Sequence, residues 1–271
     1  MKKQKIFLSI LSSLLFSGSF NIDVNTPSQI EFSIGDIYFE EFEGYKKIIS
    51  DSKGVTQQDG APELPTHSMN YAIDANKEYN VDYTVTEYEI YENINLFPFQ
   101  PVKNDLNIFT KDKNLYNSNE KYPQDNLSVS RQSMRGHYIL GIEFIPYQYD
   151  FSSKQLKIFK NVEININEIG YLDNNLAINK KSAVFENIYR NVVANEESMS
   201  TDTRSFQEPS ILYIIEDYYS IMDNLVQWRR KQGFEVTVIE RDDISGSYNT
   251  TNVKNYISNA YNNWENPPEY V

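Results

Sequence analysis

Apolar side chains recur at every second position along much of the chain between residues 30 and 169. A period of two is typical of strands that bury one face and expose the other. No helical period interrupts this pattern, so the sequence predicts an all-β domain of six or more strands, best described as a two-sheet sandwich. The clearest runs are Ile30-Phe32-Ile34, Val81-Tyr83-Val85, Tyr138-Leu140-Ile142-Phe144, Leu156-Ile158 and Val162-Ile164-Ile166.

After residue 210 the pattern changes to short apolar runs that alternate with segments of helical period. The predicted elements are a strand at 211–215, a helix at 218–231 with Ile221, Leu225 and Trp228 inward, a strand at 234–240, a helix with its N-cap at Thr250 or Thr251, and a third strand that begins at Tyr270. Alternating strands and helices imply right-handed crossovers and a parallel sheet. Two and a half strands cannot close a core, so we expect this α/β domain to continue beyond residue 271.

The first nineteen residues have the composition of a secretory signal. Three lysines at positions 2, 3 and 5 precede an apolar run at 6–16, and small residues follow at 17–19. This order predicts cleavage between Ser19 and Phe20 and a secreted or cell-surface protein. Eleven apolar residues are too few to cross a hydrocarbon core of ~30 Å, so we predict no membrane span.

The remaining segments complete the predicted layout, whose fold class is α+β with two domains. The long polar stretch at 101–131 favours a disordered insertion, although a loop of that length inside a compact domain is often functional. Residues 180–193 predict a short helix with Val184, Phe185 and Ile188 inward. The predicted domains are a signal peptide at 1–19, a β-sandwich at 20–194, a linker at 195–209 and an α/β segment at 210–271.

Composition removes several functions. The chain carries 25 Lys and Arg against 38 Asp and Glu, a formal net charge of −13, which argues against a nucleic-acid partner. It contains no cysteine, and therefore no disulfide, thiolate metal site or cysteine nucleophile of its own. His67 and His137 have no partner nearby in the sequence, so ordinary polar roles are expected for both. Adjacent Asp242 and Asp243 are a weak calcium signal, and a solvated loop or N-cap explains them better.

A set of unusual strings follows in a fixed order along the chain. They are Gly60-Ala61-Pro62-Glu63-Leu64-Pro65, Phe97-Pro98-Phe99-Gln100-Pro101, Arg135-Gly136-His137-Tyr138, Ile145-Pro146-Tyr147-Gln148-Tyr149, Gln227-Trp228-Arg229-Arg230-Lys231-Gln232-Gly233 and Pro267-Pro268 before Tyr270-Val271. Together they resemble the gingipain family of cysteine peptidases, C25, over nearly all of the chain after the signal. The resemblance covers the propeptide and the start of the caspase-like catalytic domain.

This resemblance implies a secreted zymogen, in which a β-sandwich propeptide blocks the active site of its own catalytic domain, and protein substrates for the complete enzyme. Catalysis would use a His–Cys dyad. In the family both dyad residues lie on later strands, so no catalytic residue is assigned in this chain. The resemblance leaves room for calcium in the complete catalytic domain and implies no other cofactor.

Two hypotheses about single residues follow from the resemblance. First, a basic side chain on a propeptide loop could occupy the specificity pocket of an enzyme that cuts after Arg or Lys. Lys121, Arg131 and Arg135 are the candidates, and each is equally compatible with a solvated surface cation. Second, Arg204 lies in the linker, where an activating cut would separate the two domains. The alternative function is a secreted, non-catalytic β-sandwich for adhesion or surface binding.

Overall fold

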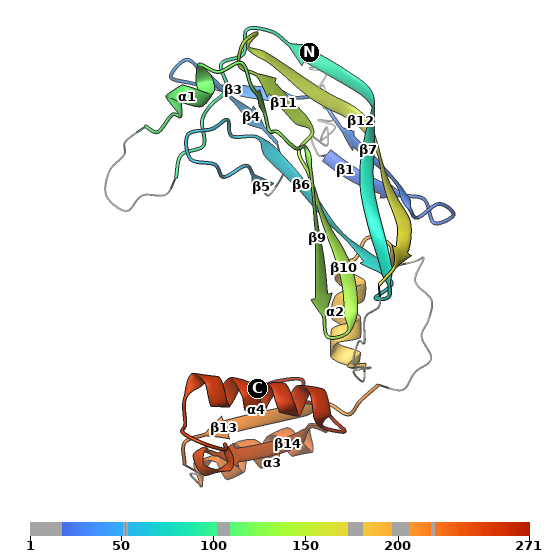
Figure 1. Cartoon of the computed structure of the whole chain (residues 1–271), viewed down its shortest axis with the longest axis vertical. Helices are drawn as coiled ribbons and strands as arrows, with labels where there is room; N and C mark the ends of the chain where they lie inside the picture. The colour runs from blue at the N-terminus through green and yellow to red at the C-terminus, as the bar shows by residue number, and fades with distance from the viewer. Residues whose placement is uncertain are drawn as a thin grey trace, which may run out of the picture. The chain divides into compact units, whose positions relative to one another are not determined.

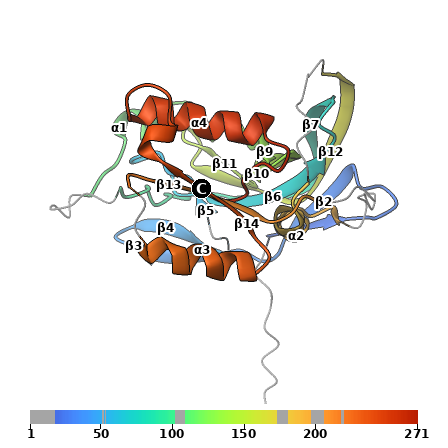
Figure 2. The same cartoon turned by 90° about the horizontal axis from the view of Figure 1, so that it is seen from below.

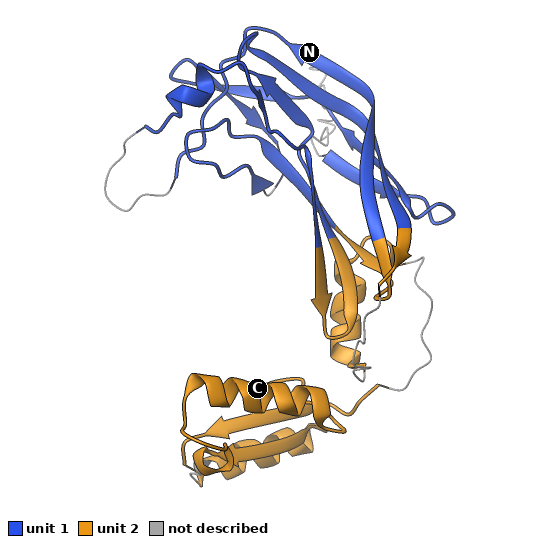
Figure 3. Ribbon diagram, in the orientation of Figure 1, with its two compact units in different colours: residues 1–69, 79–130, 141–168 blue, residues 70–78, 131–140, 169–271 orange. Residues whose placement is uncertain are grey.

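The computed structural model describes residues 18–50, 52, 54–101, 109–172, 181–196, 206–217 and 220–271. They form two compact units, coloured separately in Figure 3. Unit 1 comprises residues 1–69, 79–130 and 141–168, and unit 2 comprises residues 70–78, 131–140 and 169–271. Predicted signal residues 1–17 lie outside the described part of the chain, as does Arg204.

Between residues 18 and 171 nearly all the described elements are strands (Figure 1). Its elements are β1 Gly18–Ile22, β2 Gln29–Ile34, β3 Tyr38–Phe42, β4 Tyr45–Ile49, β5 Gly54–Val55, β6 Pro65–Ile73, β7 Lys77–Tyr91, α1 Lys113–Tyr116, β8 Lys121–Tyr122, β9 Leu127–Met134, β10 His137–Phe144, β11 Tyr147–Asp150 and β12 Gln155–Tyr171. The rest are α2 Ala183–Val192, β13 Ser210–Ile215, α3 Ile221–Lys231, β14 Glu235–Glu240, the 3-10 turn η2 Arg241–Asp243 and α4 Thr250–Asn263.

These strands form two larger antiparallel sheets. One runs β1-β2-β12-β11-β8 with β7 also paired to β12, and the other runs β5-β6-β10-β9. Within unit 1 the sheets face each other through aromatic rings: Phe32 lies 5.2 Å from His67 and 5.3 Å from Phe144, measured between ring centroids. The alternating burial of β2, in which Ile30, Phe32 and Ile34 are the buried members, has the predicted period of two. The predicted all-β architecture is therefore confirmed.

The α/β segment is a separate small layer within unit 2. Strands β13 and β14 pair in parallel, with Leu212 opposite Thr237, and helices α3 and α4 cover opposite faces of the pair (Figures 1 and 2). Tyr270 makes an isolated parallel bridge to Ile211, as expected for the start of a third strand. One hydrophobic cluster of this layer consists of the buried residues Leu212, Ile239, Ile244 and Ala260.

Two details of this segment differ from prediction. Trp228 was expected inward, but its side chain is 51% exposed. The guanidinium carbon of Arg229 lies 4.6 Å from the centre of the Trp228 ring, and Val226 is buried instead. A helical stripe therefore runs through Val226 rather than Trp228. The N-cap of α4 is Asn249, not a threonine, because its side-chain oxygen accepts a hydrogen bond from the Asn252 backbone at 2.9 Å.

The predicted disordered insertion at 101–131 was wrong for its described residues, 109–131. This stretch contributes α1, β8 and the first part of β9. The Gln100 side chain fixes the start of this stretch. Its Nε2 donates to the Thr110 carbonyl and its Oε1 accepts from the Thr110 backbone nitrogen, both at 2.8 Å. The Tyr116 hydroxyl donates to the Leu96 carbonyl at 2.8 Å. This stretch is ordered by side-chain hydrogen bonds, and its strand β9 is exposed and polar. It therefore lacks the apolar alternation from which strands were predicted.

Gly60, at the start of the first unusual string, is placed where only glycine fits. Its φ is +72°, and an added Cβ would lie 2.6 Å from the Asp112 backbone nitrogen. We expect Gly60→Ala to lower the free energy of unfolding by about 2–3 kcal/mol, because it adds steric overlap to left-handed strain. The matched control is Gly44→Ala, at φ +83° in open space, which should cost about 1 kcal/mol. Urea unfolding followed by circular dichroism measures both, and equal losses would contradict the packing argument.

Candidate functional site

The turn between β9 and β10 presents Arg135 at the tip of a hairpin. Arg135 has φ +47° and Gly136 has φ +80°, the two positive angles that a two-residue type I′ turn requires. The Arg135 guanidinium donates from Nη1 to the Pro268 carbonyl at 2.8 Å, and from Nη2 to the Pro267 carbonyl at 3.0 Å. Nη2 also donates to Gln207 Oε1 at 2.9 Å. One fork of donors thus meets three acceptors, of which Gln207 lies in the predicted linker and the two proline carbonyls lie after it.

Aromatic rings flank the same guanidinium. Its carbon lies 5.5 Å from the Phe185 ring centre and 5.4 Å from the Tyr261 ring centre, within the range of cation–π attraction. Burial lowers the pKa of Arg135, while the nearby Tyr261 and the buried Glu269 act in the opposite direction. A guanidinium stays charged under these conditions because its ordinary pKa is far above neutrality. The arrangement is therefore a cation that donates to carbonyl oxygens and is flanked by two rings, with a carboxylate nearby.

The acceptors around Arg135 are themselves fixed by a small polar network. Gln207 Nε2 donates to the Pro267 carbonyl at 2.9 Å, and the Ser210 hydroxyl donates to the same carbonyl at 2.8 Å. The Glu269 backbone nitrogen then donates to Ser210 Oγ at 3.1 Å. All of these groups are buried. We name Pro267, Pro268 and Glu269 the proline turn; β13 holds it through Ser210.

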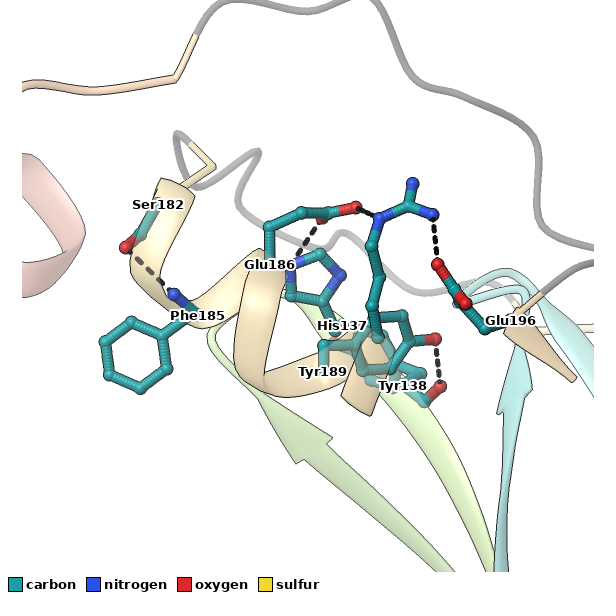
Figure 4. Close-up of polar contacts among 8 residues, drawn as sticks. His137, Tyr138, Ser182, Phe185, Glu186, Tyr189 and Glu196 are labelled. Atoms are coloured by element: carbon teal, nitrogen blue, oxygen red, sulfur yellow. Dashed lines mark hydrogen bonds and ion pairs between the residues drawn. The ribbon is translucent and has the colours of Figure 1, made fainter. Parts of the chain in front are cut away.

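Helix α2 packs on the adjacent end of β10 through a buried ionic cluster (Figure 4). Glu186 Oε2 lies 3.3 Å from His137 Nε2, and Glu186 Oε1 accepts from Arg190 Nε at 2.8 Å. The His137 and Tyr189 rings stack with centroids 4.3 Å apart. The side chains of His137 and Glu186 are 7% and 9% exposed, so both are largely removed from water.

This cluster corrects one prediction. Helix α2 was expected to bury Ile188, which is 43% exposed, whereas Glu186 and Tyr189 are the buried members. His137 was expected to be an ordinary polar residue rather than a ligand, and it lies beside the Glu186 carboxylate of helix α2. Glu186 gave no sequence signal because an isolated glutamate on a helix is usually solvated. It is buried here because two basic groups face it.

The other predicted basic candidates have different surroundings. Arg131 on β9 donates to the backbone carbonyls of Lys77 at 2.9 Å and Ala75 at 2.7 Å, with its guanidinium 5.2 Å from the Tyr138 ring centre. Lys121 on β8 is exposed, and within the described part of the chain its ammonium makes no hydrogen bond or ion pair. The three candidates are therefore not equivalent.

The remaining sequence-predicted positions bear on processing and on metals. Ser19 and Phe20 lie within β1, opposite Ser33 and Phe32, so the predicted signal cleavage would fall inside this strand.

Among the described residues, no group of three or more His, Asp or Glu side chains could hold a metal ion. Asp243 Oδ2 instead accepts from the Glu240 backbone at 2.8 Å as part of a capping box, in line with the cap interpretation. None of the described helices is both long and apolar enough for a membrane crossing.

Comparison with known families and structures gives consistent matches. The Propeptide_C25 family profile matches residues 25–203, and the profile of peptidase family C25 matches residues 204–271. Gingipain R1 of Porphyromonas gingivalis is 21% identical over 263 residues, which cover 90% of this chain and 26% of that protein. Gingipain R2 of the same species is 21% identical over 261 residues, covering 90% of this chain and 35% of that protein. The chain thus spans about a quarter to a third of the length of these relatives.

A solved structure with the same fold is among the matches. It is the complex of Porphyromonas gingivalis RgpB pro- and mature domains, matched with a TM-score of 0.55 at 18% identity. The match covers 62% of this chain and 92% of the chain compared. At 18% identity this likeness shows a shared fold alone.

Proposed function

The chain belongs to peptidase family C25, the gingipains, and from this membership we propose that it is the N-terminal part of a secreted gingipain-like cysteine endopeptidase zymogen. In this proposal the β domain acts as an inhibitor and folding aid for its own catalytic domain, of which residues 204–271 are a part. The observation that carries the proposal is the tandem match of one chain to the propeptide and then to the peptidase.

The chemistry agrees with a supporting rather than a catalytic role for these residues. A cysteine peptidase needs a thiolate nucleophile and a base that activates it. The 271 residues contain no cysteine, so the nucleophile has to come from sequence outside them. His67 and His137 are both buried in the β domain, with 6% and 8% exposure, where a substrate could not reach them. In this proposal the β domain therefore binds and restrains the catalytic domain and supplies no catalytic group.

Export is part of the same proposal. The lysines at positions 2, 3 and 5, the apolar run at 6–16 and the small residues before Phe20 support a cleaved signal. N-terminal sequencing of the protein recovered outside the cell tests this, with Phe20 expected as the first residue. A mature protein that still carries residues 1–19 would contradict it.

We assign the inhibitory basic role to Lys121, because the charged groups of Arg131 and Arg135 are already held by carbonyls of this chain. In the complete precursor, Lys121→Ala should weaken inhibition by about tenfold or more, the effect of losing one charge-assisted contact. The measurement is the rate of peptide hydrolysis by the uncut precursor. Lys113→Ala, an exposed lysine on α1, is the matched control and should leave inhibition unchanged. Equal inhibition in both variants would remove Lys121 from this role.

The experiment that tests the proposal itself is an assay of the complete precursor before a cut between residues 196 and 206, and again after the cut and removal of the β domain. Latency before the cut and hydrolysis after it support a zymogen. A reading frame that supplies no cysteine, or a catalytic domain with no peptidase activity after the β domain has been cut off and removed, would favour the adhesion alternative instead.

A further inference from the structure

Arg135 is separated from most of its partners by the linker. Arg135 and Phe185 precede residue 197, whereas Gln207, Tyr261 and the proline turn follow residue 205. A cut anywhere between 197 and 205 would therefore divide one contact cluster between two polypeptides. All members of the cluster belong to unit 2, so the contact lies within one compact unit.

The backbone at Arg135 gives an independent reason to attach importance to its side chain. The first position of a type I′ turn favours Asn, and an arginine at φ +47° carries about 1 kcal/mol of strain. The neighbouring position already has the preferred glycine, Gly136. The turn itself would thus be satisfied by Asn-Gly, and only the contacts of the guanidinium explain why arginine is useful here.

The acceptor surface is suited to a guanidinium in particular. The Pro267 and Pro268 carbonyls lie side by side along the chain after α4, where no helix uses them, and both residues are buried. The carboxylate of Glu269, which is 8% exposed, supplies negative charge near the Arg135 guanidinium. A planar fork reaches two carbonyls and an amide at once, whereas a lysine ammonium on its flexible stem would not hold the same geometry.

We propose that Arg135 is the anchor by which the β domain binds the α/β segment, and that its receptor is the proline turn with Gln207 and Tyr261. Through this anchor the two pieces stay joined without covalent connection after the linker is cut. The inference rests on the proposed function only in that it identifies the β domain with the propeptide and the α/β segment with part of the catalytic domain. The anchor holds them together, while inhibition is a separate property assigned to Lys121.

The test uses the full chain with residues 198–203 replaced by the recognition site of a site-specific protease. After the cut, size-exclusion chromatography over a dilution series measures whether the 206–271 piece elutes with the β domain. Arg135→Asn is the decisive variant because Asn-Gly is the preferred turn, so the hairpin is kept while the anchor is lost. We expect its dissociation constant to be at least about tenfold higher, equal to about 1.4 kcal/mol.

Arg131→Ala is the matched control. Arg131 is also an arginine on the same hairpin that donates to backbone carbonyls and stacks near a tyrosine, but all of these partners precede the linker. Its cut form should elute as one complex, like the parent. The proposal is overturned if the parent separates on cutting, or if Arg135→Asn elutes with the same concentration dependence as the parent. Neither readout involves peptidase activity, so failure of the anchor is distinguishable from failure of inhibition.

Discussion

Replacing Phe144 by alanine is expected to lower the free energy of unfolding of the β domain by about 3–5 kcal/mol. The Phe144 side chain is fully buried at 0% exposure. Its ring lies 5.3 Å from Phe32 and 5.2 Å from Tyr83, which belong to the opposite sheet. Removal of the ring loses apolar burial and leaves a cavity between two sheets that cannot collapse fully onto it. Urea unfolding monitored by circular dichroism measures the loss.

Ile90→Ala is the control for this prediction. Ile90 lies on β7 and is 50% exposed, so its truncation should cost less than about 1 kcal/mol. A similar loss for Phe144→Ala and Ile90→Ala would show that the two sheets do not share the core described above.

Replacing Glu186 by alanine should cost about 3 kcal/mol, because it leaves His137 and Arg190 without the carboxylate they share in a buried site. The loss should appear as release of α2 from the hairpin. Amide hydrogen exchange then accelerates within residues 183–192 before the rest of the β domain responds. Glu186→Gln keeps the shape and part of the hydrogen bonding, so its effect should be smaller.

Glu196→Ala provides the comparison for Glu186. Glu196 also contacts Arg190, at 3.3 Å, but its side chain is 48% exposed, and an exposed ion pair contributes less than about 1 kcal/mol. If Glu186→Ala and Glu196→Ala lowered stability equally, the buried cluster would not be what holds α2 in place.

Much of the fold could be predicted because burial on one face leaves a periodic trace in the sequence. Strand β2 and strand β12 show this plainly, with Phe32 opposite Val162 and Ile30 opposite Ile164. Strands β8 and β9 left no such trace. Strand β9 is exposed along nearly its whole length, and polar side chains on both faces give no alternation to detect. Its place in the sheet follows from backbone pairing, which the sequence does not encode residue by residue.

The candidate site was predicted only in part, for a related reason. Arg135 could be selected as a basic residue near a turn, but the acceptors of its guanidinium could not. Along the sequence, Pro268 is 133 residues from Arg135 and Gln207 is 72 residues from it. Backbone carbonyls exist at every residue and carry no sequence signature. The same holds for Glu186, whose burial depends on His137 from another element.

The central claim is that the β domain keeps a C25 peptidase latent. Its most direct test is the peptidase activity of the complete precursor on peptides that end in Arg or Lys, measured before and after a cut between residues 196 and 206. The account predicts that activity, on any peptide that the separated enzyme cleaves, rises at least about 100-fold once the β domain has been cut and removed, equal to about 2.7 kcal/mol of inhibitory binding. An uncut precursor as active on that peptide as the separated enzyme would contradict it.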